Sequence, residues 1–102
     1  MKKVIILICV LGILAMGSTA VAESFDIRGW CRQVSDSVGG SYVIEEGCIQ
    51  NEEEAVRNIS RMTVPPRIMK WCTEVAASVG GSYVILEGCI QNELESKGRI
   101  GN

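Results

Sequence analysis

The chain contains the same 25-residue segment twice. Residues 30–54 read WCRQVSDSVGGSYVIEEGCIQNEEE, and residues 71–95 read WCTEVAASVGGSYVILEGCIQNELE. Nineteen of these 25 positions are identical, and SVGGSYVI recurs without a change at 37–44 and 78–85. A match of this length at one fixed offset indicates the duplication of a single supersecondary unit. The fold must therefore be built from two copies of that unit.

The first half of each unit is predicted to be an amphipathic helix that ends at a glycine pair. Apolar residues recur there at i, i+3, i+4, i+7 and i+11, which is the spacing of one helix face. They are Ile27, Trp30, Cys31, Val34 and Val38 in the first copy and Ile68, Trp71, Cys72, Val75 and Val79 in the second. Glycine readily adopts the left-handed conformation at a helix C-terminus. The serines that follow, Ser41 and Ser82, are favoured N-caps for a new helix.

The second half of each unit has two interpretations. Tyr-Val-Ile after each serine is β-prone and could open a strand, with Gly-Gly as a hairpin turn. The segment 45–61 is instead rich in helix formers and free of proline, and Leu86, Ile90 and Leu94 fall at helical spacing. We therefore predict a helix. Gly47 and Gly88 lie inside it at a cost of about 1 kcal/mol each, so we expect them to mark close helix packing.

The cysteines lie symmetrically about each glycine pair. Cys31 precedes Gly39 by eight residues, and Cys48 follows Gly40 by eight. In an antiparallel helical hairpin both would lie about 12 Å from the turn, and a disulfide needs Cα atoms within about 7 Å. Four cysteines allow three connectivities, and this geometry favours Cys31–Cys48 together with Cys72–Cys89. Each disulfide would stabilise the fold by about 3 kcal/mol.

A proline-containing linker divides the chain. Residues 63–66, Thr-Val-Pro-Pro, disfavour helix, so we predict a first hairpin over 23–62 and a second over 67–102. Each hairpin has one apolar stripe, and two hairpins can bury their stripes against each other. The sequence thus predicts an all-α fold: two tandem disulfide-stapled antiparallel helical hairpins that form a small four-helix bundle.

The N-terminal 22 residues have the layout of a secretory signal peptide. Lys2 and Lys3 precede the apolar run 4–16, and Ala20-Val21-Ala22 provides a cleavage site. The alternative is an uncleaved anchor, but this run is shorter than the roughly 20 residues that span a bilayer. We expect cleavage, no stable membrane insertion afterwards, and a location in the bacterial periplasm or outside the cell. Disulfides are the usual state of cysteines there.

Charge and composition exclude several functions. Without Lys2 and Lys3, the 10 basic residues fall to 8 against 12 acidic ones, which disfavours nucleic acid or an anionic membrane as a partner. The chain has no histidine, so it lacks the commonest general base and metal ligand. A zinc site would need all four cysteines, whose spacing lacks close ligand pairs, and no Cys-x-x-Cys redox motif is present. We expect no enzyme, metal or cofactor.

Other polar and aromatic residues have a functional and a structural interpretation. The glutamates could serve acid–base chemistry or calcium, but such a run on a helix is typical of a solvated face. They are Glu45, Glu46, Glu52, Glu53 and Glu54. The aromatic residues could form a surface that stacks on a ligand, but the two tryptophans lie on the apolar stripe next to the cysteines, which favours core packing. They are Trp30, Trp71, Tyr42 and Tyr83.

The order W-C, G-G-S-Y and C-I-x-x-E resembles that of small exported bacterial proteins built from duplicated cysteine-stapled helical hairpins. The resemblance covers residues 30–54 and 71–95. It implies the same stapled fold and an exported location. Members of this group are largely uncharacterised, so it implies no catalytic residues.

The expected function is therefore that of a non-catalytic exported interaction or structural module, which binds another protein or itself as a homodimer. The alternative is a periplasmic stress-linked chaperone or inhibitor that exposes apolar surface conditionally, for example in acid. The candidate interface is Leu86, Ile90 and Leu94, because the first copy carries Glu45 and Glu53 where the second carries the two leucines. This stripe has two interpretations: a surface for a partner, or a deeper intramolecular core.

Overall fold

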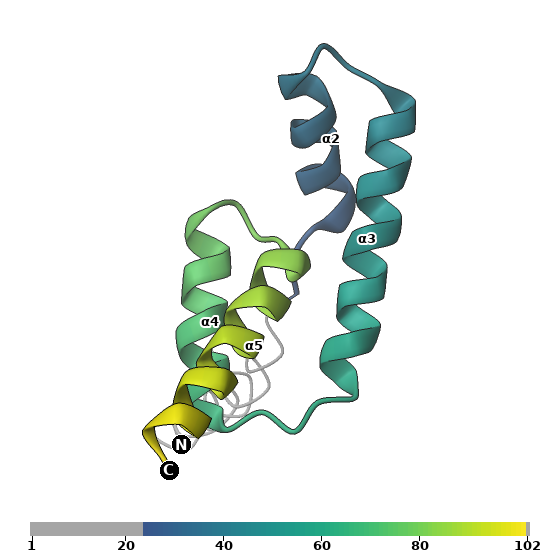
Figure 1. The fold of residues 1–102 in the computed structure, drawn as a ribbon. Helices are drawn as coiled ribbons and strands as arrows, with labels where there is room; N and C mark the ends of the chain where they lie inside the picture. Colours follow the sequence, from purple (N-terminus) through teal and green to yellow (C-terminus); the bar gives the residue numbers. More distant parts are fainter. Residues whose placement is uncertain (1–23, 102) are drawn as a thin grey trace, which may run out of the picture.

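Two helical hairpins make up the part of the chain that the structure describes. The computed structural model describes residues 24–101, and this range contains four helices and no strand. Helices α2 (Ile27–Ser37) and α3 (Tyr42–Ser60) form the first hairpin, and α4 (Pro66–Ser78) and α5 (Tyr83–Ile100) form the second (Figure 1). The all-α prediction is confirmed, and the strand alternative for Tyr-Val-Ile is wrong. The predicted signal peptide, residues 1–22, lies outside the described residues.

Each turn is formed by a glycine pair followed by a capping serine. Gly39 and Gly40 have φ angles of 103° and 85°, and Gly80 and Gly81 have φ angles of 117° and 89°. Side chains other than hydrogen are strained in this left-handed region. The hydroxyl of Ser41 then accepts a 3.3 Å hydrogen bond from the Ile44 N–H, and Ser82 caps α5 in the same way. We call residues 38–44 the first tip and residues 79–85 the second tip.

One disulfide closes each hairpin, as the cysteine spacing predicts. Cys31 bonds Cys48 with their Cα atoms 5.5 Å apart, and Cys72 bonds Cys89 with a separation of 5.6 Å. Cys31 and Cys72, on the shorter helices, are fully buried. Both covalent links lie within a hairpin, so the contact between the two hairpins is noncovalent.

The hydrophobic core is centred on the second hairpin. Its buried members are Ile68, Cys72, Ala76, Leu86 and Ile90. The first hairpin covers this cluster through α3, whose inward face includes the buried Ala55 and the half-buried Ile59. Helices α3 and α5 therefore form the main contact between the hairpins.

The proposed interface stripe lies inside the protein. Leu86 is 5% exposed, Ile90 is 0% exposed, and the partly buried Leu94 packs against the same core. Of the two interpretations, the structure shows the intramolecular core, and the stripe is not available to a partner in this conformation. The physical reason is that α3 lies along α5, so the apolar face of α5 is the one that the first hairpin covers.

The two hairpins lie side by side but are offset along their length. Figure 1 shows both tips pointing in the same direction, with the first tip standing beyond the second. The expectation for Gly47 and Gly88 is wrong, because a Cβ atom at either position would meet nothing within 4 Å. Close packing against a glycine occurs instead at Gly80 and Gly81, in the second tip.

Candidate functional site

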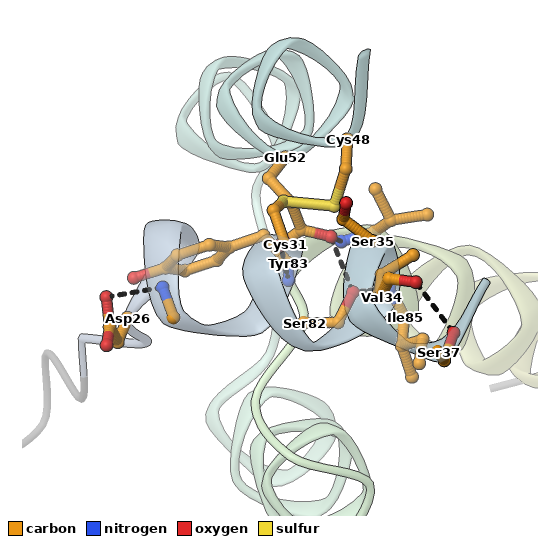
Figure 2. The surroundings of a disulfide bond; sticks show 12 residues. Asp26, Cys31, Val34, Ser35, Ser37, Cys48, Glu52, Ser82, Tyr83 and Ile85 are labelled. Atoms are coloured by element: carbon orange, nitrogen blue, oxygen red, sulfur yellow. Dashed lines mark hydrogen bonds between the residues drawn. A yellow bond between two sulfur atoms is a disulfide. The ribbon is translucent and has the colours of Figure 1, made fainter. Parts of the chain in front are cut away.

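The second tip is held by a buried carboxylate of the first hairpin. Glu52 lies on α3, one turn after Cys48, and is 2% exposed. Its carboxylate accepts hydrogen bonds of 2.6 Å from the Ser82 hydroxyl, 2.6 Å from the Tyr83 N–H and 3.4 Å from the Val84 N–H. Figure 2 shows this side chain beside the Cys31–Cys48 disulfide and turned toward the second tip. The negative charge thus meets the N-terminus of α5, where the helix dipole favours an anion.

Two aromatic residues of the first hairpin, Phe25 and Trp30, complete the contact with the second tip. The Phe25 and Tyr83 rings have centroids 5.0 Å apart, and the Phe25 N–H donates a 3.0 Å hydrogen bond to the Tyr83 hydroxyl. A Cβ atom at Gly80 would lie 2.9 Å from the Trp30 ring, and one at Gly81 would lie 3.1 Å from Phe25. Glycine is required at both positions because the backbone is left-handed there and because the Trp30 and Phe25 rings lie too close for a larger side chain.

The first tip has the same sequence but a different environment. Tyr42 is 89% exposed and Val43 is 81% exposed, whereas Ser82 in the second tip is 2% exposed. A Cβ atom at Gly39 would meet nothing within 4 Å. One copy of SVGGSYVI is therefore docked and the other is free, and we identify the free first tip as the candidate functional site.

A buried serine keeps the first tip in shape without an external partner. The Ser35 hydroxyl donates to the Ser41 carbonyl and accepts from the Ser41 N–H, both at 2.7 Å. The second copy has Ala76 at the corresponding position. The first tip is thus tied to its own helix α2, whereas the second tip is tied to Glu52 of the other hairpin.

A groove opens at the end of the second hairpin that is remote from its tip. It has a volume of about 510 Å³ and lies between the start of α4 and the end of α5. Six of its lining residues are Pro65, Ile68, Trp71, Glu93, Lys97 and Ile100. Trp71 is 54% exposed, so the expectation that it packs in the core is wrong. We call this surface the distal groove.

The remaining predicted residues do not assemble into a chemical site. Glu46, Glu53 and Glu54 are exposed, as expected of a solvated helix face. In residues 24–101 no group of three or more His, Cys, Asp or Glu side chains is placed to hold a metal ion. Among the helices of the same range, none has the length and apolar character needed to cross a membrane.

The sequence predicts that Glu52 lies on a solvated helix face with the other glutamates, and this prediction is wrong, because Glu52 is 2% exposed. The spacing to the cysteine could have indicated this burial. Glu52 follows Cys48 by four residues and so shares the inward helix face with the disulfide. The neighbouring glutamates lie on other faces of α3.

No protein-family model matches the chain, and no curated protein or solved structure shows significant similarity to it.

Proposed function

We propose that the chain is an exported, non-catalytic interaction module and that its first tip binds a protein partner, either another protein or a second copy. The observation that carries this proposal is the exposure of apolar residues at the first tip. Val38, Tyr42, Val43 and Ile44 are 61%, 89%, 81% and 41% exposed. A contiguous exposed apolar patch is typical of an interaction surface.

The first tip is also pre-organised. The Cys31–Cys48 disulfide fixes the two helices below it, and the bonds of Ser35 to Ser41 fix the turn. A surface that is already ordered loses less conformational entropy when it binds. This rigidity supports recognition by shape, with Tyr42 as the central aromatic contact.

Composition supports the non-catalytic and exported parts of the proposal. A chain with no histidine lacks the residue most often used as a general base. Two intrachain disulfides are typical of proteins outside the reducing cytosol.

The test is affinity capture from the exporting cell with the oxidised chain as bait. We expect a bound protein, or the chain itself, that is lost with the double variant Tyr42→Ser and Val43→Ser. The matched control is Val56→Ser, a 37% exposed valine on α3 outside the tip. Binding that is unchanged in the tip variant, or substrate turnover by the purified chain, would contradict the proposal.

A conditional chaperone or inhibitor is the second candidate, and one observation favours it. The stripe of Leu86 and Ile90 is covered by α3 through noncovalent contacts alone, so separation of the hairpins would expose it without breaking a disulfide. Binding of a hydrophobic dye on acidification, with both disulfides intact, would support this candidate. A constant dye signal would exclude it.

A further inference from the structure

We infer that the first tip of one chain docks into the distal groove of a second copy, so that chains associate head to tail. This inference rests on the proposed function, since it names a second copy as the partner of the first tip. The two hairpins already make a contact of this kind within one chain.

The surface that holds the second tip is itself part of the duplicated unit. Trp30 and Glu52 of the first hairpin contact the second tip. Forty-one residues further on, the second hairpin carries Trp71 and Glu93 at the same positions. Both line the distal groove. The second hairpin therefore has a counterpart of the surface that receives a tip.

This counterpart surface is open, and the segment that fits it is free. Ala55 and Ile59, which lie on the α3 face turned toward the second hairpin, correspond to Ser96 and Ile100 in the lining of the distal groove. The first tip repeats the docked sequence letter for letter. One chain thus has an empty receiving surface and an undocked copy of the segment that such a surface receives.

The internal contact specifies how the tip would be held. The Glu93 carboxylate would accept from the Ser41 hydroxyl and the Tyr42 N–H, as Glu52 accepts from Ser82 and Tyr83. Trp71 would cover Gly39, where no neighbouring atom lies within 4 Å of a Cβ position. The hydrogen bond from the Phe25 N–H to the Tyr83 hydroxyl would have no counterpart. The second hairpin has Pro66 at the position of Phe25, and proline has no N–H to donate to the hydroxyl of Tyr42.

The positions that differ between the copies are complementary in charge. Within one chain, Asn58 donates a 3.0 Å hydrogen bond to Glu87. The corresponding pair between copies is Arg99 with Glu46, a cation with an anion. A second pair of differences adds to this match.

The second pair of differences also consists of an acidic and a basic residue. Glu45 replaces Leu86 beside the tip, and Lys97, in the lining of the distal groove, replaces Val56. Both Lys97 and Arg99 are exposed. An acidic tip face would thus meet a basic groove rim, which favours this pairing over others.

The contact must form between copies. In Figure 1 the first tip and the ends of α4 and α5 that border the distal groove lie at opposite ends of the molecule. The interface is therefore heterologous, with one tip and one groove used per contact, and it leaves a free tip and a free groove on the assembly. Within one chain the linker holds the two hairpins together, so each meets the other at an effective concentration on the order of mM. Association between copies lacks this linker and should therefore be weaker and concentration-dependent.

Sedimentation velocity of the oxidised, exported chain at increasing concentration tests the inference. We expect species larger than the monomer whose fraction grows with concentration. Trp71→Ala in the groove and Tyr42→Ser in the tip should each weaken association roughly 30-fold, as for an aromatic hot spot. An equimolar mixture of the two variants should form a dimer and nothing larger, because only one intact tip and one intact groove remain.

A charge exchange provides a second test that leaves the apolar contacts in place. Glu46→Arg or Arg99→Glu alone should weaken association, and the two changes in one chain should restore it. Circular dichroism should show the same helix content for every variant. A chain that is monomeric at all concentrations, a mixture without dimers, or a double variant without recovery would overturn the inference. A monomeric chain that still captures a different protein through Tyr42 would overturn the inference and leave the proposed function standing.

Discussion

The carboxylate of Glu52 lies 2.6 Å from the hydroxyl of Ser82, so a side chain of the first hairpin completes the N-terminal cap of a helix in the second. Within residues 24–101 the corresponding serine, Ser41, meets no such carboxylate and is instead bonded through its backbone to Ser35. Two identical tips are therefore stabilised by different means, and the difference separates a docked tip from a free one.

Replacing Glu52 by Gln should destabilise the protein. The amide loses the charge, and its NH₂ group cannot accept from Ser82 or from the backbone N–H groups that the carboxylate now serves. Hydrogen bonds to a charged group contribute about 1.5–3 kcal/mol, and we expect a loss of this size in the free energy of unfolding, measured by urea denaturation. The exposed neighbour Glu53 is the control, and Glu53→Gln should change stability by less than about 0.5 kcal/mol. Equal effects of the two variants would show that Glu52 does not hold the second tip.

The duplicated glycines allow a direct measurement of tip docking. Gly80→Ala and Gly39→Ala introduce comparable backbone strain, since the φ angles are 117° and 103° and both lie in the left-handed region. Only at Gly80 would the new Cβ atom meet Trp30, at 2.9 Å. We expect Gly80→Ala to cost at least about 1 kcal/mol more than Gly39→Ala in thermal unfolding, because overpacking adds to backbone strain. A difference near zero would mean that Trp30 moves aside without cost.

Removing the Ser35 hydroxyl should loosen the first tip. Ser35 is 2% exposed and bonds both backbone groups of Ser41, so Ser35→Ala leaves these groups without that partner at a cost of about 1–2 kcal/mol. Ser37→Ala is the control, because that hydroxyl bonds the Val34 carbonyl at an exposed position. Amide hydrogen exchange at Ser41 should rise in the first variant only. Unchanged protection of this amide would contradict the assigned role.

Each disulfide should contribute separately to stability. The replacement of Cys31 and Cys48 by Ala, or of Cys72 and Cys89 by Ala, should lower the free energy of unfolding by about 3 kcal/mol on the chain-entropy model. This is a large share of the 5–15 kcal/mol that is typical of a domain. Non-reducing peptide mapping should find the remaining disulfide in each variant, and a peptide that joins the two hairpins would contradict the pairing.

A charge on the buried stripe should unfold the protein. Leu86 is 5% exposed and belongs to the core, and burying an unpaired charge there costs several kcal/mol. We expect Leu86→Glu to lose cooperative thermal unfolding. The control is Val84→Glu, at a 45% exposed position of the same helix, which should retain it. A Leu86→Glu variant with unchanged melting behaviour would restore the view of this stripe as an external surface.

Local structure could be predicted from the sequence because its determinants are local. The equal spacing of Cys31 and Cys48 about Gly39-Gly40 specified the hairpin and its disulfide together. The replacement of Glu45 by Leu86 correctly marked α5 as the helix with more apolar surface, although the pattern alone left both the core and the interface interpretation open. In both cases the residues that determine the structure are close in sequence or recur at the fixed offset of the repeat.

The arrangement of the two hairpins could not be predicted in the same way. Both tips have one sequence, so nothing within SVGGSYVI indicates which tip is docked. That choice depends on Glu52 and Trp30, which contact a segment about 30 and 50 residues away. The sequence predicts Trp71 in the core on the same grounds as Trp30, but in residues 24–101 no tip lies against Trp71, which is 54% exposed. Tertiary contacts between near-identical segments therefore decide the burial of each copy.

The placement of the two disulfides also determines how the chain would respond to mechanical tension. Residues 31–48 and 72–89 are closed covalent loops, so a pulling force on the ends passes across each disulfide and leaves the loop behind it unstretched. The segment between the loops, residues 49–71, carries the load and can extend by roughly 3.5 Å per residue. The contact between α3 and α5 is in that path and would yield first. The two hairpins would then separate while each stays closed by its disulfide and keeps its own turn and tip. The chain as a whole would lengthen through the segment between them.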